Sequence, residues 1–187
     1  MAKARTDKRG RLIETAMKLA YKHGFRETSL ADIAEAAHVP VGNVYYYFKT
    51  KDELVQAAID AQAQSIDTKL ASLDRHRSPK ARLKAFVKLL TTQRELAARY
   101  GCPHGTLSSE LNKRDDDLGQ AGTKLMQLWI DWAERQFRAL GRRDARDLAV
   151  ALIASYQGIM LLANTFNQPE LIAREARRLE RWIDSLA

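Results

Sequence analysis

The chain has 187 residues, 45% of them hydrophobic, and a formal net charge of +8 at pH 7. That hydrophobic share is enough to build a core, which excludes global disorder. The single cysteine excludes an intrachain disulfide framework and is typical of a reducing compartment. No apolar run follows the first residues, and the longest apolar stretch, 148–163, is shorter than the ~20 residues that a membrane-spanning helix requires. We therefore expect a soluble cytoplasmic protein with no membrane partner.

The positive charge is concentrated near the N-terminus. Residues 1–51 carry ten Lys and Arg against five Asp and Glu. A basic N-terminal quarter favours contact with phosphate groups, although a solvated basic tail would have the same composition.

Helical periodicity runs through the whole chain, proline is scarce and glycine falls at joints, which predicts an all-α protein of about nine helices. Ser29 or Thr28 is expected to cap the second helix, and Ser78 with Pro79 to start the fifth. The expected helices cover about 7–23, 29–37, 40–48, 51–70, 79–100, a short segment after 103, 117–140, 144–166 and 170–186.

Residues 28–51 encode a short helix, a tight turn and a second short helix, followed by lysines. This is the layout of a helix-turn-helix motif, in which the second helix enters the major groove of DNA. Val44 and Phe48 lie four residues apart, so they should pack together on Leu19, Ile33 and Ala37. Gly42 and Asn43 then point elsewhere, near the start of the second helix, where base edges are met. Asn43 can bond adenine, and Val41 can touch a thymine methyl.

The same segment resembles the TetR family of transcriptional regulators. The matching residues are Ala16, Leu19, Gly24-Phe25, Thr28-Ser29, Asp32-Ile33-Ala34, Val39, Gly42, Val44-Tyr45-Tyr46-Tyr47-Phe48, Lys51 and Glu53-Leu54. The resemblance implies a DNA-binding domain over 6–66, with its motif at 29–48, and a ligand-binding and dimerisation domain over 67–187. It implies phosphate contacts from Tyr47 and Lys51, with help from Arg5, Lys8 and Arg9. The full expected set of DNA-binding residues is Thr28, Ser29, Val41, Gly42, Asn43, Tyr45, Tyr46, Tyr47 and Lys51.

Two residues depart from the family pattern. His38 stands where the turn usually has glycine, so its backbone is expected to be awkward. Pro40 replaces the usual Ser or Thr, which removes a side chain able to cap the helix or bond phosphate. Contacts at the start of the recognition helix are therefore less defined by the resemblance.

The second half implies dimerisation and sensing. The helix at 144–166 is apolar nearly all round, and the helix at 170–186 carries a 4-3-4-3 seam, so both are expected to form a homodimer interface. The resemblance implies a near-palindromic operator and a small-molecule effector that releases the DNA. Candidate effector residues, each of which is also compatible with plain core packing, are Phe86, Leu90, Cys102, His104, Met126, Trp129, Trp132, Tyr156, Met160 and Asn164.

Cys102 lies between Gly101, which ends one helix, and Pro103, which starts the next. The segment Gly101-Cys102-Pro103-His104-Gly105 resembles one TetR subgroup, some members of which sense oxidants or electrophiles at this cysteine. A helix start favours the reactive thiolate, whereas a small buried cysteine is the simpler interpretation. A thiol-sensing repressor is therefore one alternative.

No metal site, cofactor or catalytic residue is expected. The four histidines have no ligand spacing, no Cys-x-x-Cys is present, and Ser108-Ser109-Glu110 lacks the surroundings of a nucleophile. An enzyme is thus disfavoured. The alternative from another class is an architectural DNA-binding protein without an effector, which would bind with strong salt dependence and no site preference. The chain itself is compatible with either a repressor or an activator.

Overall fold

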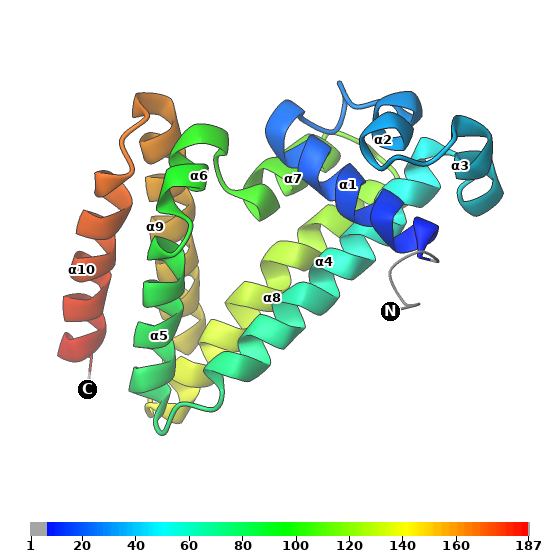
Figure 1. Ribbon diagram of the computed structural model, residues 1–187. Coiled ribbons are helices and arrows are strands. Elements are labelled where there is room, and N and C mark those ends of the chain that lie inside the picture. Colours follow the sequence, from blue (N-terminus) through cyan, green and yellow to red (C-terminus); the bar gives the residue numbers. More distant parts are fainter. Residues whose placement is uncertain (1–6, 187) are drawn as a thin grey trace, which may run out of the picture. The chain divides into compact units, whose positions relative to one another are not determined.

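The computed structural model describes residues 7–186 and contains ten helices and no strand within that range (Figure 1). The all-α prediction is confirmed. The helices are α1 (Lys8–His23), α2 (Leu30–Ala36), α3 (Val41–Tyr47), α4 (Lys51–Leu73), α5 (Pro79–Thr91), α6 (Arg94–Tyr100), α7 (Pro103–Leu111), α8 (Asp117–Ala139), α9 (Ala145–Phe166) and α10 (Glu170–Ser185).

The extra helix arises where the expected helix at 79–100 divides into α5 and α6. Thr91 and Thr92 donate their hydroxyls to the carbonyls of Lys88 and Leu89, at 2.8 and 2.7 Å. Such local side-chain bonds compete with the helical pattern. The break at residues 92–93 is therefore a local effect of two consecutive threonines. The apolar periodicity of the sequence does not predict it.

The helices form two compact units that do not follow the chain in order. The first contains residues up to 64 together with 106–125, and the second contains 65–105 together with the residues from 126 onward. Helices α4, α7 and α8 each contribute residues to both units.

The first unit is built on α1, α2 and α3. Leu12, Ala16, Ile33, Val44 and Phe48 are buried in one cluster, and Leu19 packs against it. The predicted contact of Val44 and Phe48 with Leu19, Ile33 and Ala37 is thus confirmed. Ser29 caps α2 and forms a reciprocal capping box with Asp32. Ser78 caps α5 as expected.

The second unit has its core among α5, α8, α9 and α10. Phe86, Trp132 and Phe137 are its largest fully buried side chains. Helix α10 packs on α5 and α9. Its 4-3-4-3 seam, Ile172, Ala176, Leu179 and Ile183, is buried by these contacts within the chain, so the seam is not free to face a second subunit.

Helix α9 has 22 residues, so it is longer than the apolar stretch 148–163 expected from the sequence. The mean hydropathy of its most apolar window is 1.5. Length and composition would allow it to cross a membrane, but the core helix of a soluble protein passes the same test. A third of that window is buried inside the protein.

His38 occupies the turn between α2 and α3 with φ of 53°, in the left-handed region. Its amide donates to the Glu35 carbonyl, and the Val39 amide donates to the Ala34 carbonyl, at 3.0 and 2.9 Å. These two bonds form a Schellman motif, whose left-handed position favours glycine. The expected strain at this histidine is confirmed. Pro40, predicted as the first helical residue, instead precedes α3 with ψ of 136° and supplies no side-chain cap.

We expect His38→Gly to raise the free energy of unfolding by up to about 1 kcal/mol. Relief of the left-handed strain is worth ~1–2 kcal/mol and is partly offset by the backbone entropy of glycine. Urea denaturation of the full chain measures the change. The matched control is Asn167→Gly, at the left-handed end of α9, where the smaller strain of asparagine predicts a smaller gain. A destabilised His38→Gly protein would contradict the argument.

Candidate functional site

Helix α3 presents one face to solvent and buries the other. Val44 and Phe48 lie in the core of the first unit, whereas Val41, Gly42, Tyr45 and Tyr46 are exposed. A Cβ placed on Gly42 would meet nothing within 4 Å, so the surface beside it is open. An exposed helix with small and polar residues near its start is the geometry that allows side chains to reach base edges in a major groove.

The three tyrosines differ in their environment. Tyr46 is 77% exposed, and its ring lies edge-on to that of Tyr47 with centroids 5.0 Å apart. Tyr47 is partly buried and packs on the core cluster, whereas Tyr45 is exposed. Tyr47 follows Val44 by three positions, so the two residues share the buried face of α3.

Thr28, Ser29 and Lys51 already make contacts within the chain. Thr28 is only 4% exposed, and its hydroxyl donates to the Gly24 carbonyl at 2.9 Å. The Lys51 ammonium lies 4.4 Å from the centre of the Phe25 ring and donates to the Arg26 carbonyl at 3.2 Å. Partial burial lowers the pKa of Lys51. These residues hold the loop between α1 and α2 in place.

Basic residues near the N-terminus were also expected to help bind DNA. The Arg9 guanidinium lies 5.3 Å from the centre of the Phe48 ring, beside the end of α3. Lys8 is the first residue of α1. Arg5 lies outside the described residues.

Two long-range polar contacts in the first unit were missed by sequence reasoning. The Phe25 amide donates to the Glu110 carboxylate at 2.8 Å. The Arg114 guanidinium donates to both carboxylate oxygens of Asp52, at 3.3 and 2.6 Å, and also bonds Asp116. These contacts tie segment 106–125 to both ends of the helix-turn-helix region. No local pattern signals them, because the partners lie 85 and 62 positions apart.

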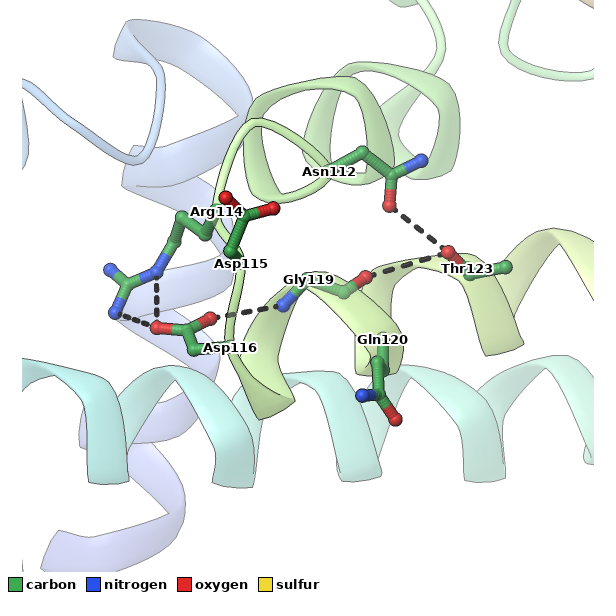
Figure 2. A pocket seen from close by; sticks show the side chains of 7 residues that line it. All are labelled: Asn112, Arg114, Asp115, Asp116, Gly119, Gln120 and Thr123. Carbon is green, nitrogen blue, oxygen red and sulfur yellow. Dashed lines mark hydrogen bonds and ion pairs between the residues drawn. The ribbon is translucent and has the colours of Figure 1, made fainter.

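A polar hollow of about 370 Å³ lies beside the connection between α7 and α8. Figure 2 shows that its polar groups mostly bond one another: Asn112 accepts from Thr123, and Asp116 pairs with Arg114 and caps α8 at Gly119. None of the ten candidate effector residues lines this hollow. Its hydrogen bonds serve to hold the turn.

Aromatic candidate residues gather in the second unit. The Phe86 ring lies 5.5 Å from Trp129, 5.7 Å from Trp132 and 6.1 Å from Tyr156, measured between ring centroids. The His104 ring lies 5.8 Å from that of Trp129. Helices α5, α7, α8 and α9 thus contribute one cluster, which we call the aromatic cluster: Phe86, His104, Trp129, Trp132 and Tyr156.

The other candidates lie at its edge or apart from it. Asn164 donates to the Ala98 carbonyl at 3.0 Å. Trp132, which belongs to the cluster, donates its indole N–H to Asp74 at 2.9 Å. Leu90 and Met160 are buried core residues. Gln157 was not foreseen, although its amide nitrogen lies 3.5 Å from both Cys102 Sγ and Met126 Sδ. Its place opposite the helix-capping cysteine depends on tertiary packing.

Cys102 accepts from the Gly105 amide at 3.4 Å, as expected of a residue at a helix start. It is 5% exposed, and its sulfur lies 3.4 Å from the Tyr156 hydroxyl. Reactive sensor cysteines occupy partly exposed, electropositive surroundings. The packed environment does not favour the thiol-sensing alternative.

The exposed helix α3, packed on α1 and α2 in the first unit, is the arrangement of a helix-turn-helix DNA-binding domain. Comparison with known proteins specifies the family. The model described as "Bacterial regulatory proteins, tetR family" matches residues 12–58, and that described as "Transcriptional regulator LmrA/YxaF-like, C-terminal domain" matches residues 79–178. The chain belongs to the TetR family, whose members are transcriptional regulators and not enzymes.

Relatives match over most of their length. A helix-turn-helix regulator in the lacX 3' region of Lactococcus lactis subsp. lactis is 32% identical over 161 residues, which cover 81% of each chain. The transcriptional repressor DhaR from Mycobacterium sp. is 30% identical, covering 84% of this chain and 83% of DhaR. A TetR regulator structure from Legionella pneumophila superposes with a TM-score of 0.82 at 22% identity, covering 99% and 98% of the two chains. The last comparison supports the fold.

His104 makes stability depend on pH. Burial lowers the pKa of its imidazole to about 4, and the charge of Lys69 adds to the effect. Between about pH 6.5 and 4 the unfolded chain therefore binds a proton that the folded chain does not. Stability is fully present above pH 6.5 and falls as the pH drops, by on the order of 3 kcal/mol at pH 4.

The test compares urea unfolding of the wild type and His104→Gln at several values between pH 7.5 and 4.5. Subtracting the variant removes the titration of carboxylates common to both proteins. We expect the stability difference to shrink towards low pH, because only the wild type loses the histidine contribution. Parallel curves would contradict the assignment.

Proposed function

We propose that this protein is a homodimeric repressor that binds a near-palindromic operator and releases it when a small molecule binds the second unit. The observation that best supports DNA reading is the exposed face of α3, because Val44 and Phe48 anchor the other side of this helix in the core. The repressor name of its relative DhaR supports the sign of regulation. Such a protein acts in the cytoplasm, where its operator is.

In this proposal Asn43 and Val41 meet base edges, and Gly42 lets the backbone approach the DNA closely. Tyr45, Tyr46, Tyr47 and Lys51 contact phosphates, which set orientation without reading sequence. Ser29 and Thr28 contribute through the start of α2, Thr28 by its main chain, because its hydroxyl is already bonded. The DNA-binding domain covers 6–66 and the ligand-binding and dimerisation domain covers 67–187.

Helix α7 offers a physical route for release. Its first residues include His104 and Gly105, which belong to the second unit, and its last turn includes Glu110, which holds the Phe25 amide in the first. A ligand that displaces the start of a nine-residue helix moves its end as well. An effector acts only if it binds one conformation better than the other.

The dimer is proposed to form through α9, flanked by the outward side of α10. Val150, Leu161, Leu162 and Phe166 are exposed along α9, and Ala151, Ala154 and Gly158 lie between them. Residues 147, 151, 154, 158, 161 and 165 follow a 4-3-4-3-4 spacing, which is the seam of paired helices. Between Asp147 and Thr165 the seam contains only small or apolar residues, and an exposed apolar face of this kind marks an interface in a soluble protein.

DNA reading is tested by footprinting upstream of the protein's own gene. We expect Asn43→Ala to weaken specific binding roughly 5- to 150-fold and to relax the preference at one base, because a base contact is worth ~1–3 kcal/mol. Tyr47→Phe should weaken binding to all sequences alike. Tyr100→Phe, which removes a hydroxyl from α6, is the control. Salt-sensitive binding without a protected site would instead support an architectural protein.

The interface is tested with Leu161→Arg, because Leu161 is 65% exposed and lies on the α9 seam. The change removes two buried leucines from a two-fold interface and adds two charges, so we expect dimerisation to weaken by about 100-fold or more. Sedimentation equilibrium measures this. Leu96→Arg, an equally apolar exposed position on α6, should leave the dimer intact. Loss of the dimer in the control alone would place the interface elsewhere.

A further inference from the structure

Trp129 carries a buried donor without a partner. Its side chain is 4% exposed, and its Nε1 has no hydrogen-bond acceptor among the described residues. Trp132, one turn further along α8, donates its indole N–H to Asp74 at 2.9 Å. More than nine in ten buried polar groups in proteins are satisfied, and buried indoles follow this rule. Trp129 is therefore an exception that calls for an acceptor.

Gln157 is a second poorly matched donor on the same side of α8. Its amide nitrogen lies 3.5 Å from two sulfur atoms, those of Cys102 and Met126. Sulfur is a weak acceptor, so these bonds are easily exchanged for a bond to oxygen. Met126 precedes Trp129 by three residues, which places both on one face of α8. The two donors therefore border a common region.

The side chains around Trp129 are mostly aromatic or apolar, and the charge of Lys69 acts on His104. Phe86 lies between the rings of Trp129 and Tyr156, and His104 lies against Trp129. Burial keeps the imidazole of His104 neutral at pH 7, with its pKa lowered to about 4. A charged ligand would lose its hydration here with little compensation. The glycine at position 105 leaves room for the Gln157 side chain, because a Cβ there would collide with the carboxamide oxygen of Gln157.

We propose that the effector of this protein is an uncharged, flat organic molecule with two oxygen acceptors, one bonded by Trp129 Nε1 and the other by Gln157 Nε2. The aromatic cluster stacks on its ring system, and Gln157 turns from sulfur to the ligand. This inference rests on the proposed function and specifies the chemistry of its ligand. The competing occupant is a buried water, which needs two to four polar partners.

Three matched probes test the chemistry by equilibrium dialysis with the full-length protein in the absence of DNA. Coumarin is an uncharged bicycle with two ring-side oxygens, naphthalene has the same shape without acceptors, and 2-naphthoate adds a negative charge. We expect coumarin to bind about tenfold more tightly than naphthalene, because two neutral hydrogen bonds each add a few-fold. We expect 2-naphthoate to bind more weakly than coumarin.

Variants then locate the donors. Trp129→Phe and Gln157→Leu should each reduce the preference for coumarin over naphthalene about 3- to 10-fold. Trp132 belongs to the aromatic cluster, so Trp132→Phe should weaken the binding of both probes alike. It should leave the preference between them unchanged, because its N–H is already bonded to Asp74. Using the ratio of two probes cancels general changes in packing.

A ligand-free measurement guards against misfolding or a poor choice of probe. Both Trp→Phe variants lose the same atoms, but only Trp132→Phe breaks a hydrogen bond. We expect the unfolding constant of Trp132→Phe to exceed that of Trp129→Phe by about fivefold or more. Equal destabilisation would show that Trp129 Nε1 is bonded, for example to a water, and would overturn the proposal.

The proposal is also overturned if coumarin fails to bind, if naphthalene binds as tightly, if 2-naphthoate binds better, or if Trp129→Phe keeps the preference. Footprinting with the same wild-type preparation distinguishes failure of the proposed ligand chemistry from failure of the proposed regulatory function. A protected operator with no probe preference rejects the ligand chemistry alone, whereas absence of any protected site rejects the regulator.

Discussion

The hydrogen bond from the Phe25 amide to the Glu110 carboxylate is the contact on which the first unit depends. Phe25 follows Gly24, where α1 ends, and the loop after it leads into α2. With the Arg114–Asp52 pair it holds both ends of the DNA-reading region to segment 106–125. Hydrogen bonds to charged groups are worth more than neutral ones and are lost as a whole when the partner moves. The orientation of α3 therefore depends on residues near the middle of the chain.

Local signals in the sequence predicted most of the helices. Asp7, Ser29 and Ser78 each cap the helix that they precede, and Gly24 and Gly101 each adopt the positive φ of a helix stop. The failures were also local in origin. Two consecutive threonines divided the helix expected at 79–100, and Pro40 precedes α3 instead of starting it.

The polar contacts of the site were beyond sequence reasoning for a different reason. Glu110 looks like an ordinary helix residue, and Gln157 looks like an interruption in an apolar helix. Each acquires its partner only when α7 and α9 are placed in their units, so no spacing in the chain encodes them. Trp129 and Trp132 illustrate the same limit, although they lie three residues apart on one helix. The Trp132 indole is bonded to Asp74, whereas that of Trp129 has no acceptor in the part of the chain that the structure describes.

The difference in hydrogen bonding between the two indoles bears on the free energy of regulation. A ligand shifts an equilibrium only by the difference in its affinity for two states, and 1.4 kcal/mol corresponds to about a tenfold shift. An unsatisfied buried donor destabilises the ligand-free state by ~1–3 kcal/mol. In the proposed complex, an acceptor that bonds Trp129 Nε1 recovers this energy. The unpaired indole is thus a defect in stability of the same size as the coupling that a regulatory switch requires.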